Sequence, residues 1–428
     1  MDDFLLKELF TNKSYFEDAV KVGFDKDIPR AVLSKISDTD FRIEWMNQIA
    51  RGEYMIFPPR TALIPKPEPG AFRKVKINQP LDRIFLRAVN SMLMNLTRET
   101  MIHENCRSYI KDDSCGKTVK DISSKIASIS SSIAGFKADL SKYFDSVPIE
   151  FIEKAFDGVE ERFGHSSVID VLRAYYKDNR YFEKDESGTW VLCNNYESLK
   201  QGCAVSSWLA DVILYDLDAE LSNLNGTYIR YCDDILYVGD YYAIAMQLLV
   251  INLKKKSLIL NPKKVEFIDA NHWVKFLGFS IKGSSISISE SGLEKFQQAV
   301  DDVTIKYRKK TTIKQALKRV WKVLYDGYNG YSWAKRVLPV INVHEDLIKM
   351  NGYILDSIRA CVTNKRKIGG LGFVKTQPIG CVARGKGQNV KANKEKIPQI
   401  DGYYSLQGMK NVLEIDKFAY ESLVRTNL

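Results

Sequence analysis

The sequence is poor in the residues that build disulfide frameworks and zinc sites. Its seven cysteines are odd in number and form no Cys-x-x-Cys pair, and only four histidines occur in 428 residues. This composition supports neither a disulfide framework nor a zinc site. We therefore expect a protein of a reducing compartment that binds no zinc.

Long apolar runs are also missing. No apolar stretch is long enough to span a bilayer, and the first residues, Met1-Asp2-Asp3-Phe4, lack the positive charge that opens a signal peptide. No internal repeat is evident, which argues against a solenoid. These absences predict a soluble, cytoplasmic protein with no membrane partner.

Acidic residues are outnumbered by basic ones. The chain has 63 Lys and Arg against 53 Asp and Glu, a formal net charge of +10. Such an excess favours a polyanionic partner. A chain of this length is too long for a single core and predicts several subdomains.

Two adjacent carboxylates, Asp233 and Asp234, lie between two stretches with the composition of strands, residues 227–230 and 235–238. β-Branched and aromatic residues dominate both stretches, so the pattern predicts a hairpin with the acids at its tip. Adjacent like charges are best tolerated in water or around a cation. The alternative is a solvated turn, where most Asp-Asp pairs occur.

A third carboxylate, Asp139, stands at the end of a stretch that begins as a strand at Phe136. Phosphoryl transfer with two Mg²⁺ ions needs carboxylates from separate strands that converge on one point. Asp139, Asp233 and Asp234 supply that set, so we predict them as catalytic residues and metal ligands. The alternative is a set of unrelated surface acids.

Several further motifs follow a fixed order along residues 60–285, and together they resemble a reverse transcriptase. Tyr231-Cys232-Asp233-Asp234 is similar to the third palm motif of that family and Asp139 to an acid of the first. Residues 201–207 resemble the second, Gln-Gly-x-x-x-Ser-Pro, with Ser207 in place of proline. Residues 260–264 resemble the Leu-Asn-Pro-x-Lys motif, and residues 276–279 a primer-grip hairpin. Arg73 precedes Asp82-Arg83 with the spacing of the fingers motif.

The resemblance implies the roles of further site residues. Lys264 is the expected proton donor to departing pyrophosphate, with a solvated loop lysine as the alternative. Phe144 resembles the aromatic wall that excludes a 2′-hydroxyl, although it is also explained as plain core. The expected cofactors are two Mg²⁺ ions, for which Mn²⁺ can substitute, with deoxynucleoside triphosphates as substrates. The residues expected to bind the nucleotide are Arg73, Lys74, Phe144, Gln201 and Gly202.

Two basic stretches are expected to bind nucleic acid. Residues 305–322 hold eight basic residues and no acid, which predicts a basic helix that follows the template–primer backbone or, alternatively, a solvated face. Residues 365–396 hold nine basic residues and one acid among several glycines, which indicates a segment that docks structured RNA or a disordered basic tail. The nucleic-acid contacts predicted from these stretches and from the third palm motif are Tyr231, Cys232, Lys309, Lys310, Lys318, Arg366, Arg384 and Lys386. Residues 108–113 depart from the family pattern, so no site residue is assigned there.

The expected fold class is α+β, a right-hand polymerase with an antiparallel palm sheet. A long helix is predicted from about Leu81 to Thr97, and the palm is expected to be interrupted by two helical insertions. The predicted divisions are a helical N-terminal extension (1–58), fingers (59–131), palm (132–286), a helical thumb (287–360) and a basic RNA-docking region (361–428).

The length, the Tyr-Cys-Asp-Asp form and the basic tail look most like the bacterial defence-associated reverse transcriptases, in particular the type 2 systems. This resemblance implies an enzyme that copies a structured non-coding RNA into DNA, with an RNA–DNA duplex as its product. The sequence does not determine the oligomeric state, for which we favour a monomer bound to RNA. Three alternatives stay open. They are a retron enzyme, a template-independent polymerase of abortive infection primed from its own tyrosine, and an RNA-binding scaffold with a vestigial palm.

Overall fold

The computed structural model of the chain describes residues 3–21, 28–65, 70–109, 115–129, 133–269, 271–307, 312–326 and 333–363. These residues form two compact units. The first consists of Met1–Tyr109, Phe136–Tyr237 and Tyr241–Glu266, and the second of Ile110–Gly135, Val238–Asp240 and Phe267–Leu428. The α+β class expected from the sequence is confirmed, whereas the five predicted divisions remain a prediction.

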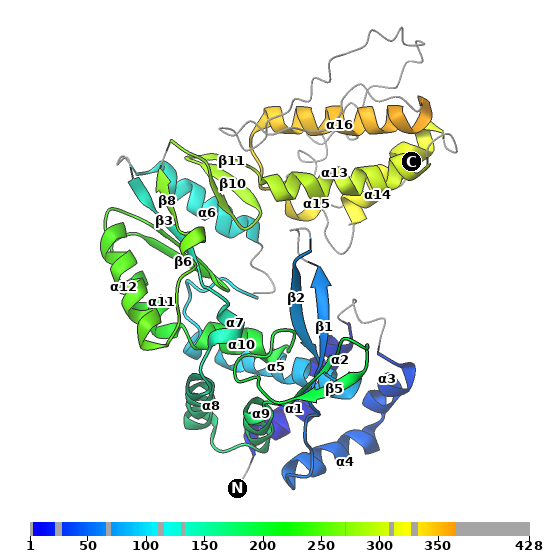
Figure 1. The fold of residues 1–428 in the computed structure, drawn as a ribbon, viewed down its shortest axis with the longest axis vertical. Coiled ribbons are helices and arrows are strands. Elements are labelled where there is room, and N and C mark those ends of the chain that lie inside the picture. The colour runs from blue at the N-terminus through cyan, green and yellow to red at the C-terminus, as the bar shows by residue number, and fades with distance from the viewer. Residues whose placement is uncertain are drawn as a thin grey trace. The chain divides into compact units, whose positions relative to one another are not determined.

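Four helices open the first unit: α1 (Phe4–Thr11), α2 (Lys13–Lys21), α3 (Arg30–Ser37) and α4 (Thr39–Ala50) (Figure 1). Aspartates start two of them, because the carboxylate of Asp3 accepts the N–H of Leu6 and that of Asp38 accepts the N–H of Asp40. Trp45 of α4 is buried at the centre of this helical layer. The helical periodicity predicted for the stretch is therefore confirmed.

The long helix α5 (Pro80–Met101) runs through the first unit and confirms the helix predicted from about Leu81 to Thr97. Pro80 stands in its first turn, where a missing N–H costs nothing. Its buried Asp82 accepts a hydrogen bond from the Tyr54 hydroxyl at 2.7 Å and another from the Phe57 N–H at 3.1 Å. Asp82 thus fastens the segment that enters the next sheet.

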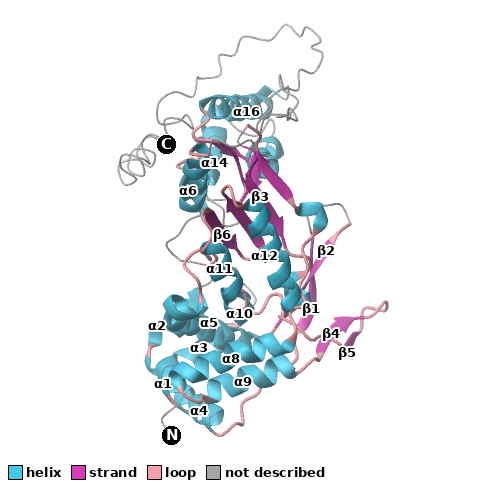
Figure 2. Cartoon of the chain, turned by 90° about the vertical axis from the view of Figure 1, so that its left-hand side faces the viewer, coloured by secondary structure: helices cyan, strands magenta, loops and turns pink. Residues whose placement is uncertain are grey.

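That sheet has the strand order β2-β1-β4-β5 and joins two hairpins far apart in sequence. Its strands are β1 (Arg60–Pro65), β2 (Phe72–Ile77), β4 (Tyr181–Lys184) and β5 (Trp190–Cys193). Figure 2 shows the short β4–β5 hairpin beside β1 and β2. β1 and β2 pair antiparallel along their whole length, and β1 meets β4 in parallel at Arg60 and Phe182.

The second sheet has the order β6-β7-β3-β8. Its strands are β3 (Ile133–Asp139), β6 (Thr227–Tyr231), β7 (Asp234–Val238) and β8 (Glu266–Asp269). Three helical stretches lie between β3 and β8, where the sequence predicted two helical insertions. They are α7 (Tyr143–Ser146) with α8 (Ile149–Phe163) and α9 (Ser167–Lys177), then α10 (Val205–Val212) with α11 (Tyr215–Ser222), and last α12 (Tyr242–Lys255) with the 3-10 turn η1 (Pro262–Lys264).

The second unit contains a three-stranded sheet and a set of helices. The sheet, of order β11-β10-β9, is built from β9 (Val274–Phe276), β10 (Phe279–Lys282) and β11 (Ser285–Ile288). The helices are α6 (Cys115–Ala127), α13 (Glu290–Thr304), the 3-10 turn η2 (Ile305–Tyr307), α14 (Ile313–Asp326), α15 (Trp333–Arg336) and α16 (His344–Thr363). The helical character predicted for residues 287–360 is confirmed within the described part of this range.

Of the basic stretch 305–322, the structure describes residues 305–307 and 312–322. The 3-10 turn η2 ends at Tyr307, and α14 begins only at Ile313. Thr312 starts that new helix, because its hydroxyl accepts the Gln315 N–H at 3.3 Å while the Gln315 side chain accepts the Thr312 N–H at 3.1 Å. This reciprocal capping sets an independent helix start. In the part of the chain that the structure describes, no helix has the length and apolar character needed to cross a bilayer.

Candidate active site

Three carboxylates meet at one edge of the sheet that holds β3, β6 and β7. β3 ends at Asp139 and its neighbour β7 begins at Asp234, so the two strand ends lie side by side. The N–H of Leu140 donates to the carbonyl of Asp233 at 3.3 Å, which closes the junction. Asp139 is buried, whereas Asp233 and Asp234 are half-buried. The predicted hairpin is confirmed, and its acids do not form a fully solvated turn.

The turn between β6 and β7 holds a strained residue under several restraints. Cys232 has φ of 56°, in the left-handed region that residues other than glycine rarely adopt. Its N–H donates to the Ser108 hydroxyl at 2.7 Å, and its carbonyl accepts the Arg230 guanidinium at 3.2 Å. The surrounding structure thus fixes a backbone conformation that alone costs energy. Ser108 lies in the segment to which the sequence analysis gave no site residue.

A buried arginine, Arg230, connects this turn to the neighbouring helices. The side chain of Arg230 is fully buried, and its Nε donates to Asp218 of α11 at 2.7 Å. A second guanidinium nitrogen donates to the carbonyl of Asp211 at 2.9 Å, and the Tyr228 hydroxyl donates to Asp218 at 2.7 Å. The network ties β6 to α10 and α11, and therefore sets where the acids lie. Sequence reasoning missed Arg230, although a lone charge in an apolar strand was a visible signal.

Burial and mutual repulsion act on the acids. Burial raises the pKa of Asp233, and the nearby Asp139 carboxylate raises it further. Burial likewise raises the pKa of Asp234, against the opposing effect of Lys137, whose ammonium lies 3.7 Å from its Oδ1. The Lys264 ammonium lies 2.8 Å from Oδ2 of Asp139, and this hydrogen bond raises the pKa of Lys264. Two lysines thus offset part of an excess of negative charge.

This donor set fits divalent ions. Carboxylate oxygens are the ligands that Mg²⁺ prefers, and a cation would relieve the repulsion that raises the pKa of Asp233. Among the described residues, one group of three potential ligands has donor atoms that all lie within 4.8 Å of one another, and it is not this one. The donor atoms of Asp139, Asp233 and Asp234 therefore do not all lie within 4.8 Å of one another in the absence of an ion.

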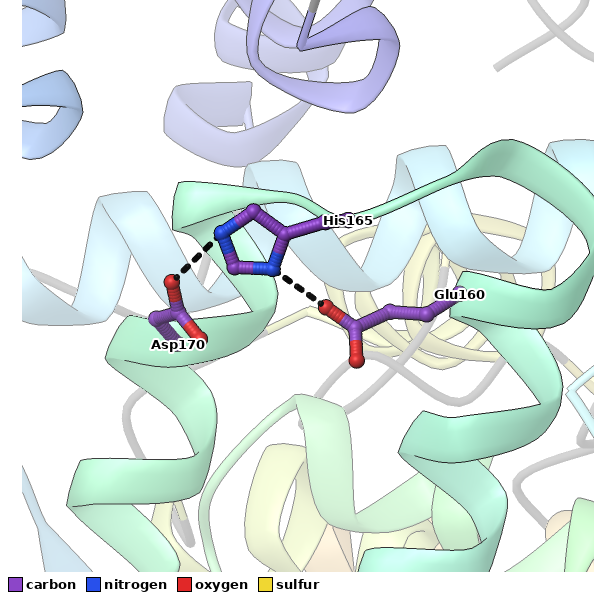
Figure 3. Close-up of side chains that lie close together, drawn as sticks. All are labelled: Glu160, His165 and Asp170. Atoms are coloured by element: carbon purple, nitrogen blue, oxygen red, sulfur yellow. Dashed lines mark hydrogen bonds and ion pairs between the residues drawn. The ribbon is translucent and has the colours of Figure 1, made fainter. Parts of the chain in front are cut away.

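The compact group lies elsewhere, between α8 and α9, and consists of Glu160, His165 and Asp170 (Figure 3). Each ring nitrogen of His165 faces a carboxylate, at 3.2 Å for Glu160 and 3.3 Å for Asp170. Glu160 also pairs with Arg173 at 2.7 Å and accepts the Ser166 N–H at 3.3 Å. Contacts among α8, α9 and the loop between them account for this arrangement, so we assign no metal to the group.

Four of the five residues predicted to bind the nucleotide occupy β2 and the loop before α10, and the fifth, Phe144, lies on α7. Arg73 is exposed on β2. Lys74 points to the opposite face of that strand, where its ammonium pairs with Glu183 of β4. The structure therefore does not bring Lys74 to the same face as Arg73.

The Gln-Gly segment is locked to β2. The carbonyl of Gln201 accepts the N–H of Lys76 at 2.6 Å. Gly202 has φ of 104°, and a Cβ at this position would lie 2.7 Å from the carbonyl oxygen of Lys76. Only glycine allows this close approach of the two backbones. Gly202 thus has a structural reason to be glycine that is independent of any bound nucleotide.

Phe144 lies on α7, five residues after Asp139, and is half-buried. Its ring packs edge-on against Tyr143 at 5.8 Å, and the Tyr143 hydroxyl donates to the carbonyl of Ala210 at 2.8 Å. The Phe144 side chain also packs against the hydrophobic core of the first unit. This position agrees with both interpretations made from the sequence, a wall beside the sugar and a core residue, so a direct test is needed.

Replacement of Phe144 by alanine is expected to admit ribonucleotides, because the proposed exclusion is steric. We expect primer extension with ribonucleoside triphosphates to rise about tenfold or more, a change of ~1.4 kcal/mol in the barrier. Phe144→Tyr is the matched control, since it keeps the ring and should keep the exclusion. Equal exclusion by wild type and Phe144→Ala would assign the residue to the core.

The predicted nucleic-acid contacts are only partly described. Tyr231 and Cys232 are half-buried beside the acids, and Lys318 is exposed on α14. The remaining predicted contacts, Lys309, Lys310, Arg366, Arg384 and Lys386, lie outside the described residues.

Two buried lysines beneath the β2–β1–β4–β5 sheet were not predicted. The Lys76 ammonium donates to the Thr61 hydroxyl at 2.9 Å and lies 3.2 Å from the ring centroid of Tyr181. The Lys200 ammonium donates to the carbonyl of Asp178 at 2.7 Å. Both lysines lie within 6 Å of the Tyr196 ring, at 4.9 and 5.6 Å. Burial lowers the pKa of each lysine to about 8.

This depression predicts a pH dependence of stability. A lysine whose pKa is lower in the folded state binds fewer protons when folded than when unfolded. The folded state is therefore destabilised by the full amount below about pH 8, and this destabilisation disappears as the pH rises toward 10.5. Relative to a Lys76→Met, Lys200→Met variant, the wild type should gain about 5 kcal/mol in unfolding free energy between pH 7 and pH 10, roughly half from each lysine. Urea unfolding at both pH values measures the difference. A constant difference would show that the lysines titrate normally.

A comparison with known protein families agrees with this geometry. The sequence profile of a family described as reverse transcriptase (RNA-dependent DNA polymerase) matches residues 64–281. A search of curated proteins gives no significant match. Among solved structures, apo telomerase from Candida tropicalis is similar at a TM-score of 0.49 and 13% identity, over 74% of this chain and 62% of that chain.

Two further telomerase structures are similar. The Candida tropicalis enzyme truncated from its C-terminal domain gives a TM-score of 0.45 and 14% identity, over 57% of this chain and 59% of that chain, so this chain spans about three fifths of its length. The same enzyme with the TWJ fragment of telomeric RNA gives 0.44 and 13%, over 75% and 67%. Because the family profile covers more than half of the 428 residues and includes all three acids, the chain belongs to the reverse transcriptase (RNA-dependent DNA polymerase) family.

Proposed function

We propose that the protein is an RNA-directed DNA polymerase that copies a structured partner RNA into DNA with Mg²⁺ as its cofactor. The observation that carries this proposal is the convergence of Asp139, Asp233 and Asp234 at adjoining strand ends, with Lys264 hydrogen-bonded to the first of them. The chemistry that Mg²⁺ supplies when bound to such a site is activation of the attacking 3′-oxygen and neutralisation of the leaving pyrophosphate.

The chain's own residues then have defined tasks. The three carboxylates hold the divalent ions, and the buried Arg230 keeps their strand ends in register. The pKa of Lys264 is raised by Asp139, so its ammonium holds a proton at neutral pH that it can give to departing pyrophosphate. Arg73 presents an exposed guanidinium that binds the triphosphate oxygens of the incoming nucleotide.

The charge of the C-terminal part of the sequence supports a structured RNA as the template. Residues 365–396 hold nine basic residues and one acid. Such a segment neutralises several phosphates, and its glycines let the main chain approach an irregular backbone. Together with the Tyr-Cys-Asp-Asp form, it supports a dedicated non-coding RNA as the template and a role in bacterial antiphage defence, with the protein acting as a monomer bound to its RNA in the cytoplasm.

Sequencing the nucleic acid that co-purifies with the full-length protein, before and after phage infection, tests this proposal. We expect one abundant structured RNA and, after infection, DNA complementary to it. DNA joined covalently to RNA would favour a retron enzyme instead. Untemplated DNA joined to a tyrosine would favour an abortive-infection polymerase, and RNA without DNA would indicate a binding scaffold.

A further inference from the structure

The nucleotide site predicted from the sequence combines two segments that are far apart in the chain. They are the short helix α7, which carries Phe144, and the loop before α10, which carries Gln201 and Gly202. α7 has only four residues, and Lys142 before it has φ of 48°, in the left-handed region. A helix of one turn is not stable by itself, so contacts from other elements must set the orientation of α7.

Two such contacts involve the residues on either side of Phe144. The preceding residue, Tyr143, is buried, and its hydroxyl donates to the carbonyl of Ala210 on α10 at 2.8 Å. The following residue, Asp145, accepts a hydrogen bond at its Oδ1 from the Tyr196 hydroxyl at 3.0 Å. Phe144 therefore lies between two neighbours that are each fastened to another part of the first unit.

The Tyr196 hydroxyl is also tied to the Gln-Gly segment. It shares its hydrogen with the carbonyl of Leu199, and the backbone of Gln201 forms a hydrogen bond with it. Burial raises the pKa of Tyr196, and the Asp145 carboxylate raises it further, so the hydroxyl keeps its proton and acts as a donor. One hydroxyl thus joins the turn that carries Phe144 to the segment that carries Gln201.

Two cations and a second aromatic ring hold the ring of Tyr196. The ammonium groups of the buried Lys76 and Lys200 lie 4.9 and 5.6 Å from its centroid. The ring of Tyr181 meets it edge-on at 6.1 Å. Cations near the face of a ring and edge-on ring pairs are both favourable contacts that restrict its orientation. Tyr196 therefore presents its hydroxyl to α7 from a fixed position.

We propose that Tyr196 is a positioning residue for sugar discrimination, which acts through its hydrogen bond to Asp145. This bond holds the turn that carries Phe144 at a set distance from the Gln201-Gly202 segment. A ring excludes a 2′-hydroxyl only if the ring cannot move away, so the residues that support it determine how strictly it discriminates. The inference rests on the proposed function and on Phe144 as the wall beside the sugar.

The test is primer extension by the full-length protein, with kcat/KM measured for a deoxynucleotide and for the corresponding ribonucleotide. Tyr196→Phe keeps the ring and removes the hydroxyl, so the ratio of the two values should fall about fivefold, the effect of losing one ordinary hydrogen bond. The value for the deoxynucleotide alone should change little. Asp145→Ala should lower the ratio equally, whereas Asp145→Asn should keep most of it, because its amide oxygen still accepts the hydroxyl.

Tyr181→Phe is the matched control, because the Tyr181 hydroxyl donates to Asn195 at 2.9 Å and not to α7. Its ring belongs to the same cluster as Tyr196, yet the ratio should stay at the wild-type value. Adding Tyr196→Phe to Phe144→Ala should lower the ratio no further, since both substitutions act on one wall. Thermal unfolding confirms that each variant is folded.

Several results would overturn the proposal. An unchanged ratio in Tyr196→Phe or Phe144→Ala would do so, as would additive effects of the two. Equal losses of kcat/KM for both nucleotides, or an equal fall in Tyr181→Phe, would show a structural role only. A fall in Asp145→Ala that Tyr196→Phe does not share would mean that Asp145 acts on the sugar directly.

Failure of the proposed function is recognised separately. If the wild type adds neither kind of nucleotide to any primer, the polymerase assignment is wrong and this inference is wrong with it. If the wild type extends primers and discriminates, and Tyr196→Phe discriminates equally well, the polymerase assignment stands and only the role of Tyr196 is wrong.

Discussion

Replacement of both Asp233 and Asp234 by alanine is expected to abolish incorporation of deoxynucleotides. Both residues lie at the start of β7 beside Asp139, and chemistry that depends on divalent ions fails without their ligands. The fold should persist, because the change removes two half-buried like charges whose pKa values are already raised by burial and by Asp139. Primer extension measures the loss of activity, and urea unfolding should show no fall in stability.

Asp216→Ala is the control for this variant, since Asp216 is an exposed acid on α11 that should be dispensable. DNA synthesis by the double variant at the wild-type rate would remove these residues from the active site.

The second large effect is expected from Arg230→Met. The substitution leaves the buried carboxylates of Asp211 and Asp218 without their cation, and such a change typically costs about 3–5 kcal/mol. The same substitution should displace Cys232 and the acids that follow it, because the Cys232 carbonyl no longer accepts a hydrogen bond from the guanidinium. Urea unfolding measures the first effect and primer extension under folding conditions the second.

An ion pair at the protein surface distinguishes the effect of losing a buried cation from the effect of losing a charge alone. Arg180→Met removes the partner of Asp178 at an exposed site and should leave stability almost unchanged. Adding Asp218→Asn to Arg230→Met should restore part of the lost free energy of unfolding, since it removes one buried negative charge that has no cationic partner. If Arg180→Met and Arg230→Met lower the free energy of unfolding by the same amount, burial of the Arg230 network does not contribute to stability.

The parts of the site that the sequence predicted are those encoded by local pattern. The strand before Asp139, the hairpin around Asp233 and the long helix after Pro80 each follow from a run of side chains with one periodicity. The acids come together because their strands are neighbours in one sheet, which the order of the motifs indicated. Local pattern and the order of the motifs were thus enough to place the three carboxylates close together.

What the sequence did not predict depends on contacts between distant residues. Arg230 of β6 forms a hydrogen bond with Asp218 of α11, on a different element of secondary structure. The Lys76 ammonium contacts the ring of Tyr181, which is more than a hundred positions away in the sequence. No periodicity encodes such pairs. The start of α14 is different, because Thr312 and Gln315 have the spacing of a capping box, a local signal that a count of charges overlooks.

The central claim, that these three acids catalyse DNA synthesis directed by RNA, is tested most directly by sequencing the product of one reaction. The full-length protein is given a defined RNA template, an annealed DNA primer, all four deoxynucleotides and Mg²⁺, with Asp139→Asn as the inactive control. We predict DNA complementary to the template from the wild type and none from Asp139→Asn. No extension by the wild type, or a product whose sequence does not change when the template changes, would contradict the account.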